Sequence, residues 1–246
     1  MLKVTDVSKR FGNVEALVDI DLTLDRGLIH GVVGPNGAGK TTLLNIISGY
    51  LLPGVGRVVL EGRDITRLTP QQRVPLGVVR TFQNIRLFGD LTVFENVLLG
   101  QHTRSQSGPR SLVPVRSARD KRLRAEAANL LDLFELTPYR KRRAAELPYA
   151  VQKQLELARA LAAGPKLLLL DEPAAGMTTA GRQTLVHRIR QIRDGGLSIV
   201  VVEHDIDVIS KLCDVVTVLN FGRKLATGIP KAVFDSDAVR AAYLGT

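Results

Sequence analysis

The fold of this chain is decided by the stretch Gly34-Pro35-Asn36-Gly37-Ala38-Gly39-Lys40-Thr41-Thr42. An apolar run at 28–33 precedes it and predicts a buried strand, and apolar residues at helical spacing follow it as far as Gly49. Glycines between a strand and a helix let backbone N–H groups approach an anion closely. Lys40 would then reach the β- and γ-phosphates of a nucleotide, and the Thr41 hydroxyl would bind Mg²⁺. The stretch therefore predicts a nucleoside triphosphate site, whereas a dinucleotide-binding turn would space its glycines differently and need no lysine.

Two carboxylates follow a run of four leucines. The leucines at 167–170 predict a buried strand, and Asp171 and Glu172 come directly after it. In open α/β sheets, ligands bind at the carboxyl ends of the strands. Asp171 would there hold Mg²⁺ directly or through a water, and Glu172 would act as general base on a water in line with the γ-phosphate. Without the phosphate loop upstream, the same pair would also fit a solvated acidic turn.

Three further side chains lie where such a site could use them. His204 follows the apolar strand predicted at 199–202, and Gln83 ends the strand predicted at 78–83, where it could bind Mg²⁺ or position a water. Phe11 lies on a turn before the phosphate loop and could stack on adenine. Taken singly, each of the three would also fit a structural role.

The rest of the chain predicts one α/β domain with two additions. Alternating apolar residues at 2–26 predict an N-terminal antiparallel β subdomain. Helical periodicity at 91–161 predicts an inserted helical subdomain, with a flexible basic loop at 104–110. The nucleotide-binding core would then comprise residues 1–90 and 162–246.

Composition narrows the class of protein further. Among 246 residues, 45% are hydrophobic, yet no apolar stretch approaches the ~18 residues needed to cross a bilayer. We expect no signal peptide, because residues 1–6 run directly into a strand pattern, and Cys213, the only cysteine, excludes an intramolecular disulfide. The formal charge of +10 is compatible with a nucleic acid, an anionic membrane surface or a solvated face.

Together these residues resemble the nucleotide-binding subunit of an ABC transporter, in order over nearly the whole chain. The resemblance implies a P-loop ABC ATPase core that binds ATP and Mg²⁺. It assigns the Walker A loop to 34–42, the Q-loop to Gln83, Walker B to 167–172 with Glu172 as catalytic glutamate, the switch histidine to His204 and the adenine-stacking aromatic to Phe11.

A narrower resemblance points to the ATP-binding subunits of branched-chain amino acid importers. It rests on the stretches at 80–88, 171–177 and 242–245 and on the long loop after His102. It implies an ATPase on the cytoplasmic face of the membrane that works with a second ABC ATPase subunit, two integral membrane permease subunits and, indirectly, a substrate-binding protein, without nucleic acid. Urea and amide importers share much of the pattern. The alternatives are a lipid or polysaccharide exporter, and a soluble non-transport ABC ATPase or regulator with weak hydrolysis.

The signature motif departs from the family. Where the family has Leu-Ser-Gly-Gly-Gln or Leu-Ser-Tyr-Gly-Gln, this chain has Leu147-Pro148-Tyr149-Ala150-Val151-Gln152. In the family this motif acts across a dimer on the phosphate held by the other subunit. Pro148 fits the first turn of a helix but offers neither hydroxyl nor N–H, and Ala150 adds a methyl group where phosphate approaches. Thr178 also replaces the family's D-loop acid or amide.

These departures affect the partner's nucleotide rather than the one on this chain. A lost hydrogen bond to a charged group is worth ~1.5–3 kcal/mol, roughly a ten- to hundredfold effect. We therefore predict an asymmetric heterodimer, in which Lys40, Glu172 and His204 face a partner's intact signature. A homodimer, the alternative, would carry the defect at both sites.

Overall fold

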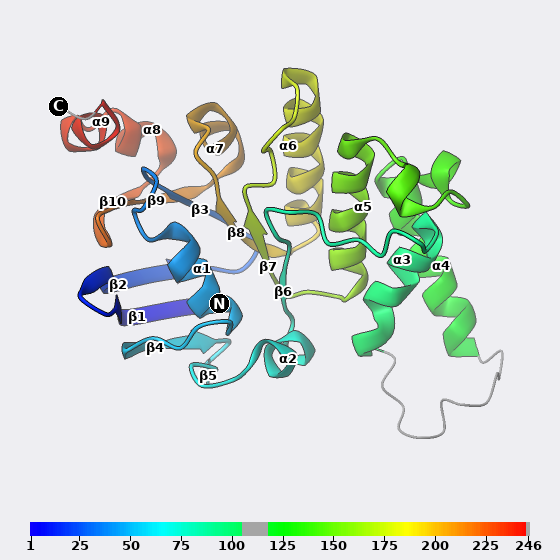
Figure 1. Cartoon of the computed structure of the whole chain (residues 1–246), viewed down its shortest axis with the longest axis horizontal. Helices are drawn as coiled ribbons and strands as arrows, with labels where there is room; N and C mark the ends of the chain where they lie inside the picture. The colour runs from blue at the N-terminus through cyan, green and yellow to red at the C-terminus, as the bar shows by residue number, and fades with distance from the viewer. Residues whose placement is uncertain (105–117, 245–246) are drawn as a thin grey trace.

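The structure, a computed structural model, describes residues 1–104 and 118–244. Within them the chain forms two β-sheets and a group of helices, coloured from blue to red along the chain in Figure 1. The basic loop predicted at 104–110 lies outside the described residues from Ser105 onward, and so does Gly245. No helix in the described part is both long enough and apolar enough to span a membrane.

The first sheet is antiparallel and lies at the N-terminal end of the chain (Figure 1). Its strand order is β2-β1-β4-β5. In β1, Leu2 and Val4 alternate with less buried residues, and a break in the pairing register after Val4, where Asp6 has a φ of 51°, brings Val7 into the same buried cluster. Phe11 ends β1 and pairs with Val14, so the turn of the hairpin lies just beyond it. The strands are β1 (Leu2–Phe11), β2 (Val14–Leu24), β4 (Val55–Leu60) and β5 (Arg63–Asp64).

The second sheet carries the buried strands and has the order β10-β9-β3-β8-β7-β6. Its strands pair in parallel from β9 to β6, and β10 is antiparallel to β9. In β7, Leu167 and Leu169 contribute to one hydrophobic cluster, and Leu168 and Leu170 to the other, which is why the run lacks polar residues. The strands are β3 (Ile29–Val33), β6 (Val78–Arg80), β7 (Leu167–Asp171), β8 (Ser198–Val202), β9 (Val215–Asn220) and β10 (Arg223–Gly228).

Helix α1 (Lys40–Ser48) packs between the two sheets. Its apolar residues Leu43, Leu44, Ile46 and Ile47 share one cluster with the antiparallel sheet and with alternate residues of β7 and β8. The helix ends at Gly49, whose φ of 84° is the left-handed conformation that favours glycine. This packing fixes the N-terminus of α1 at the carboxyl edge of the parallel strands.

The other face of the parallel sheet is covered by helices, several of which form a separate lobe at the right of Figure 1. Helix α3 begins with a capping box, in which Thr92 and Glu95 exchange hydrogen bonds. Its Asn96 is buried and bonds the carbonyl oxygens of Phe88 and Thr92 at 3.1 and 3.0 Å. The helices here are α3 (Val93–Gly100), α4 (Ala118–Leu133), α5 (Tyr149–Ala162), α6 (Thr179–Asp194) and α7 (Ile206–Leu212).

The predicted α/β architecture is confirmed, with strands and helices in the expected order. The division of the chain at residues 91 and 161 stays a proposal. Sequence patterns missed α2 (Pro70–Arg73), α7 and α8 (Pro230–Phe234), because helices this short span too few turns for a period to emerge. Capping residues were the available signal: the Asp205 carboxylate accepts the N–H groups of Asp207 and Val208 at the start of α7. Helix α9 (Asp237–Leu244) follows α8.

Candidate nucleotide site

The glycine-rich loop runs from β3 into α1, as its sequence predicts. Gly34 has a φ of 148°, and a Cβ there would come within 2.1 Å of the Leu219 carbonyl oxygen. Gly39 has a φ of 101°, and a Cβ would come within 2.6 Å of the Ala16 carbonyl oxygen. Both positions therefore require glycine for conformation and for space. Because α1 starts at Lys40, the free N–H groups of its first turn face the loop.

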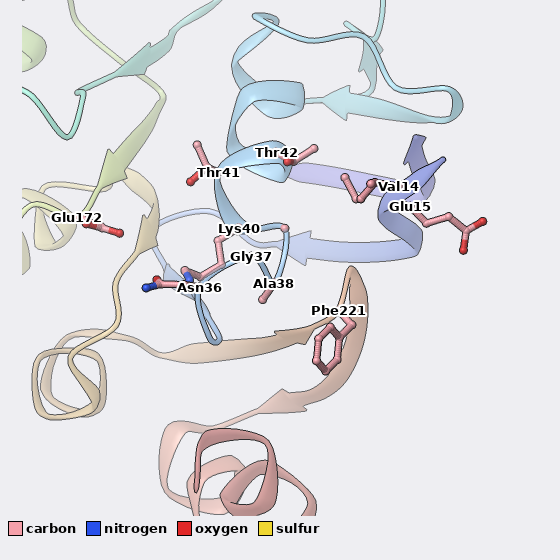
Figure 2. A pocket seen from close by; sticks show the side chains of 12 residues that line it. Val14, Glu15, Asn36, Gly37, Ala38, Lys40, Thr41, Thr42, Glu172 and Phe221 are labelled. Atoms are coloured by element: carbon pink, nitrogen blue, oxygen red, sulfur yellow. The ribbon is translucent and has the colours of Figure 1, made fainter. Parts of the chain in front are cut away.

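A pocket of about 340 Å³ opens over this loop. Figure 2 shows Glu172 at one end, with Val14, Glu15 and Phe221 at the other. An elongated ligand with a charged tail and a flat apolar head would match this division. The lining residues are Val14, Glu15, Ala16, Asn36, Gly37, Ala38, Gly39, Lys40, Thr41, Thr42, Glu172 and Phe221.

Lys40 lies in the pocket with its ammonium group held by the loop itself. Nζ donates to the carbonyl oxygens of Gly34 and Pro35 over 2.7 and 2.9 Å. Burial lowers the pKa of Lys40, while the charges of Glu172 and Asp171 raise it. The ammonium group is therefore fixed at the loop, where the sequence predicts the phosphates.

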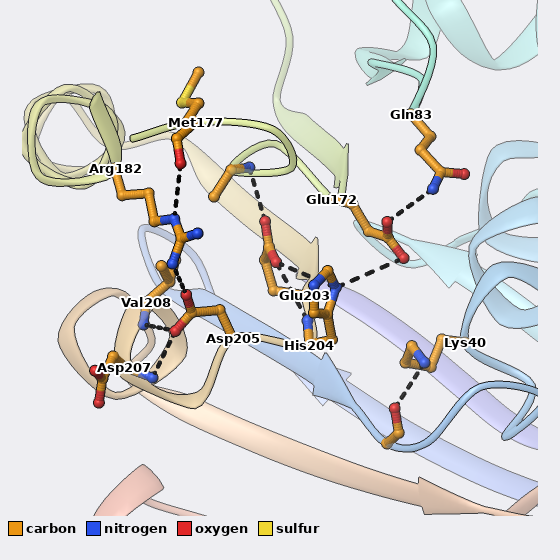
Figure 3. A network of polar contacts seen from close by, with 12 residues as sticks. Lys40, Gln83, Glu172, Met177, Arg182, Glu203, His204, Asp205, Asp207 and Val208 are labelled. Carbon is orange, nitrogen blue, oxygen red and sulfur yellow. Dashed lines mark hydrogen bonds and ion pairs between the residues drawn. The ribbon is translucent and has the colours of Figure 1, made fainter. Parts of the chain in front are cut away.

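Gln83, Glu172 and His204 meet beside Lys40, although they come from three separate loops (Figure 3). Gln83 Nε2 donates to Glu172 Oε2 over 2.8 Å, and His204 Nδ1 lies 4.0 Å from Glu172 Oε1. Glu172 is the residue after β7 and has a φ of 46°, a conformation rare outside glycine. The three side chains that the sequence predicts for the chemistry thus lie together around the Glu172 carboxylate.

Asp171 and Thr41 are the residues predicted to hold Mg²⁺. Thr41 is exposed in the first turn of α1, and Asp171 is buried at the end of β7. Hydroxyl and carboxylate oxygens are hard donors of the kind that Mg²⁺ prefers, together with phosphate oxygens. Asp171 has a partner that sequence analysis missed, because Arg80 Nη2 donates to its Oδ2 over 2.8 Å. The predicted Mg²⁺ role of Gln83 stays a prediction, since its side-chain amide donates to Glu172 in the structure.

Glu203 is a second buried carboxyl that sequence analysis did not single out. Its side chain is 1% exposed, and it accepts the N–H groups of Ala174 and His204 over 2.8 and 3.2 Å. Burial raises its pKa, and the Ala174 hydrogen bond lowers it. Glu203 thereby ties the loop after Glu172 to the backbone of His204. The signal in the sequence was a carboxyl next to the histidine after a buried strand.

One aromatic residue lines the end of the pocket opposite Glu172, and a second was predicted to contact adenine. Phe221, in the β9–β10 turn, lines the pocket, is 86% exposed and has a φ of 44°. Sequence analysis missed it, because a single aromatic in a turn carries no periodic signal. Phe11 is 49% exposed, with Lys9 Nζ 5.4 Å from its ring centroid, and does not line this pocket. Its predicted contact with adenine stays a prediction.

The altered signature segment lies at the start of α5. Pro148 is the N-cap residue, and its carbonyl oxygen accepts the N–H groups of Val151 and Gln152. Leu147 is buried, whereas Pro148, Tyr149 and Ala150 are exposed. The substitutions therefore preserve the helix start and change only the surface that it presents.

Thr178 has a structural role of its own. It is the N-cap of α6, where its side chain accepts the Gly181 N–H over 3.2 Å. In the next turn Arg182 donates to the Met177 carbonyl oxygen and pairs with Asp205 at 2.6 Å (Figure 3). The loop after Glu172 is thus attached to the segment that carries His204.

Comparisons with known proteins agree with this geometry. A family model described as ABC transporter matches residues 17–175. The chain is 36% identical over 249 residues to the high-affinity branched-chain amino acid transport ATP-binding protein LivG of Escherichia coli K12, covering 100% of this chain and 98% of that protein.

Solved structures give the same picture. The ADP conformation of an ATP-binding cassette of an ABC transporter matches with a TM-score of 0.88 and 29% identity, over 100% of this chain and 99% of that one. A dimeric post-hydrolysis state of an ATP-binding cassette bound to ADP and Pi matches with a TM-score of 0.79 and 25% identity, over 94% and 99% of the two chains.

Proposed function

We propose, since this chain belongs to the ABC transporter family, that it is the ATP-hydrolysing subunit of an importer for branched-chain or related amino acids. One observation carries the catalytic part: Gln83, Glu172 and His204 converge on one point beside the phosphate loop. The solute class is supported by the 36% identity to LivG over the whole chain, because the named function of that protein is branched-chain amino acid transport.

The phosphate end of the pocket holds the triphosphate. Backbone N–H groups of the loop and of the first turn of α1 bind the phosphate oxygens, and Lys40 adds a charged donor. Thr41 and Asp171 would hold Mg²⁺ against the same oxygens, and the ion would supply charge neutralisation there.

Hydrolysis then needs a base and groups that position the water. Glu172 accepts the proton of the attacking water, and Gln83 fixes the orientation of its carboxylate by donating to Oε2. His204 lies beside the other carboxylate oxygen of Glu172, Oε1, where it can contact the γ-phosphate or the same water. The left-handed backbone conformation of Glu172 sets the direction of its side chain, so the carboxylate that acts as the base faces the site.

A second subunit and membrane partners complete the assembly. We infer that the exposed face of Pro148, Tyr149 and Ala150 meets the nucleotide of a second ABC ATPase subunit, and that a heterodimer is favoured because this face lacks the serine hydroxyl. The dimeric cassette bound to ADP and Pi supports the pairing. The assembly would lie on the cytoplasmic face of the membrane, against two permease subunits served by a substrate-binding protein.

Transport in proteoliposomes tests this function. The chain is purified with its membrane partners from solubilised membranes, and ATP-dependent uptake of radiolabelled leucine and valine is measured, with urea and ribose as competing solutes. Lys40→Ala should abolish uptake, whereas Lys166→Ala should not, because Lys166 pairs with Glu61 away from the pocket. Uptake that persists in Lys40→Ala would refute the ATPase role. Nucleic acid as the sole co-purified partner would refute the transport role.

A further inference from the structure

Arg80 and Asp171 form a buried ion pair at the ends of two neighbouring strands. Arg80 is the last residue of β6, Asp171 is the last residue of β7, and these strands pair in parallel. Nη2 of Arg80 lies 2.8 Å from Oδ2 of Asp171, and the two side chains are only 6% and 8% exposed. A buried ion pair is weak evidence for stability, because removing both charges from water offsets much of their attraction. Its position at a predicted Mg²⁺ ligand therefore needs another explanation.

The guanidinium group of Arg80 is held from several sides. Nη1 donates to Asn45 Oδ1 and Ser48 Oγ over 2.6 and 3.0 Å, and both residues lie on α1. The same group lies 5.3 Å from the ring centroid of Phe82. Arg80 thus joins the helix that starts at Lys40 to the strand that ends at Asp171. With so little freedom, it presents Asp171 in one orientation.

We propose that Arg80 is a positioning residue that neutralises Asp171 and makes Mg²⁺ binding depend on the nucleotide. Oδ2 of Asp171 is taken by Arg80, which leaves Oδ1 for the cation or its water. The charges of Lys40 and Arg80 balance those of Asp171 and Glu172, so these four groups attract a divalent cation weakly by themselves. Only the phosphates of ATP add the negative charge that the cation requires. The inference rests on the proposed role of Asp171 in holding Mg²⁺.

The test measures Mn²⁺ binding by electron paramagnetic resonance, with and without a non-hydrolysable ATP analogue. The readout is the Mn²⁺ dissociation constant without nucleotide divided by the constant with nucleotide. This ratio reports how strongly the nucleotide promotes cation binding. Arg80→Gln should lower this ratio at least tenfold, mainly through tighter Mn²⁺ binding without nucleotide. Arg80→Lys loses the planar fork of donors but keeps the positive charge on which the neutralisation of Asp171 depends, so its ratio should stay within about threefold of the parent chain.

Arg86 is the matched control. Its guanidinium also stacks on Phe82, at 4.1 Å from the ring centroid, yet its side chain makes no described contact with Asp171. Arg86→Gln should leave the ratio unchanged. Circular dichroism establishes that each variant is folded, and if Arg80→Gln does not fold, Arg80→Lys decides: a tenfold loss in this charge-retaining variant would overturn the proposal.

Asp171→Asn separates this inference from the proposed function. If Asp171 holds the cation, Asp171→Asn weakens Mn²⁺ binding in the nucleotide complex, and adding Arg80→Gln to it has no further effect. An unchanged ratio in Arg80→Gln, with a clear loss in Asp171→Asn, would overturn only the role of Arg80. No loss in Asp171→Asn would instead refute the proposed Mg²⁺ site.

Discussion

The side-chain amide of Gln83 donates a hydrogen bond of 2.8 Å to the Glu172 carboxylate, across 89 residues of sequence. This contact joins the loop after β6 to the loop after β7. Glu172 itself has a φ of 46°, and such a backbone typically costs a non-glycine residue ~1–3 kcal/mol. Glu172, the strained residue, is therefore oriented by Gln83, which lies in the segment that connects β6 to helix α3 of the helical lobe.

Replacing Glu172, the proposed general base, should separate nucleotide binding from hydrolysis. Glu172→Gln keeps an acceptor for Gln83 but cannot take a proton, so steady-state ATPase activity of the assembled complex should fall by about 10²–10⁴-fold. ATP affinity, measured by isothermal titration calorimetry, should stay within a few fold. Glu15→Gln is the control, because Glu15 lines the same pocket at its other end. Equal activity in the two variants would exclude Glu172 as the base.

Restoring the signature should raise activity. Pro148→Ser with Ala150→Gly returns a hydroxyl and removes a methyl group from an exposed surface at the start of α5. If the second active site regains one hydrogen bond to a charged group, ATPase activity at that site should rise roughly ten- to hundredfold, and the activity of the complex should rise with it. Turnover per complex is compared at saturating ATP. No gain at all would count against the asymmetric arrangement.

Phe221 lies at the end of the pocket where the nucleobase of ATP would bind, so replacing it should lower the affinity only for ligands that carry a nucleobase. Phe221→Ala should weaken ATP binding by about five- to hundredfold, since stacking of a base on an aromatic ring is worth ~1–3 kcal/mol. Binding of inorganic tripolyphosphate, which has no base, should not change. Leu225→Ala is the control, because Leu225 lines the neighbouring pocket and is not among the residues that line this one. Phe11→Ala, measured alongside, tests the aromatic predicted from sequence.

His30 should make stability depend on pH. It is buried on β3, where Nε2 lies 2.8 Å from Thr217 Oγ1, and burial lowers its pKa from 6.5 to about 4. The unfolded chain then binds this proton more readily, so the contribution of neutral His30 is present above pH 6.5 and is lost as pH falls to about 4. The full difference corresponds to roughly 3 kcal/mol.

Urea denaturation between pH 4 and 7 measures this effect. His30→Gln should flatten the decline of the unfolding free energy at low pH, while His187→Gln, on the exposed face of α6, should not. Identical slopes for His30→Gln and the parent chain would show that some other group is responsible.

Local patterns in the sequence predicted much of the site, because its main parts are continuous. The glycine-rich loop, the strand before it and the helix after it occupy consecutive residues. The spacing of Gly34, Gly39 and Lys40 was therefore sufficient to predict this strand, loop and helix. The leucine run before Asp171 likewise identified a strand buried on both faces. Short helices such as α7 were not predicted, because they contain too few turns to show a helical period in their apolar residues.

The sequence by itself determined that this chain has a phosphate loop, a central strand with two carboxylates at its end, and an altered signature. Only the tertiary structure decided which side chains act together. Arg80 reaches Asp171 across 91 residues because β6 and β7 pair in parallel and end at the same edge. Phe221 reaches the pocket because the β9–β10 turn lies against the phosphate loop, where the Gly222 N–H bonds the Ala38 carbonyl oxygen. Such contacts depend on strand order and register, which no local pattern encodes.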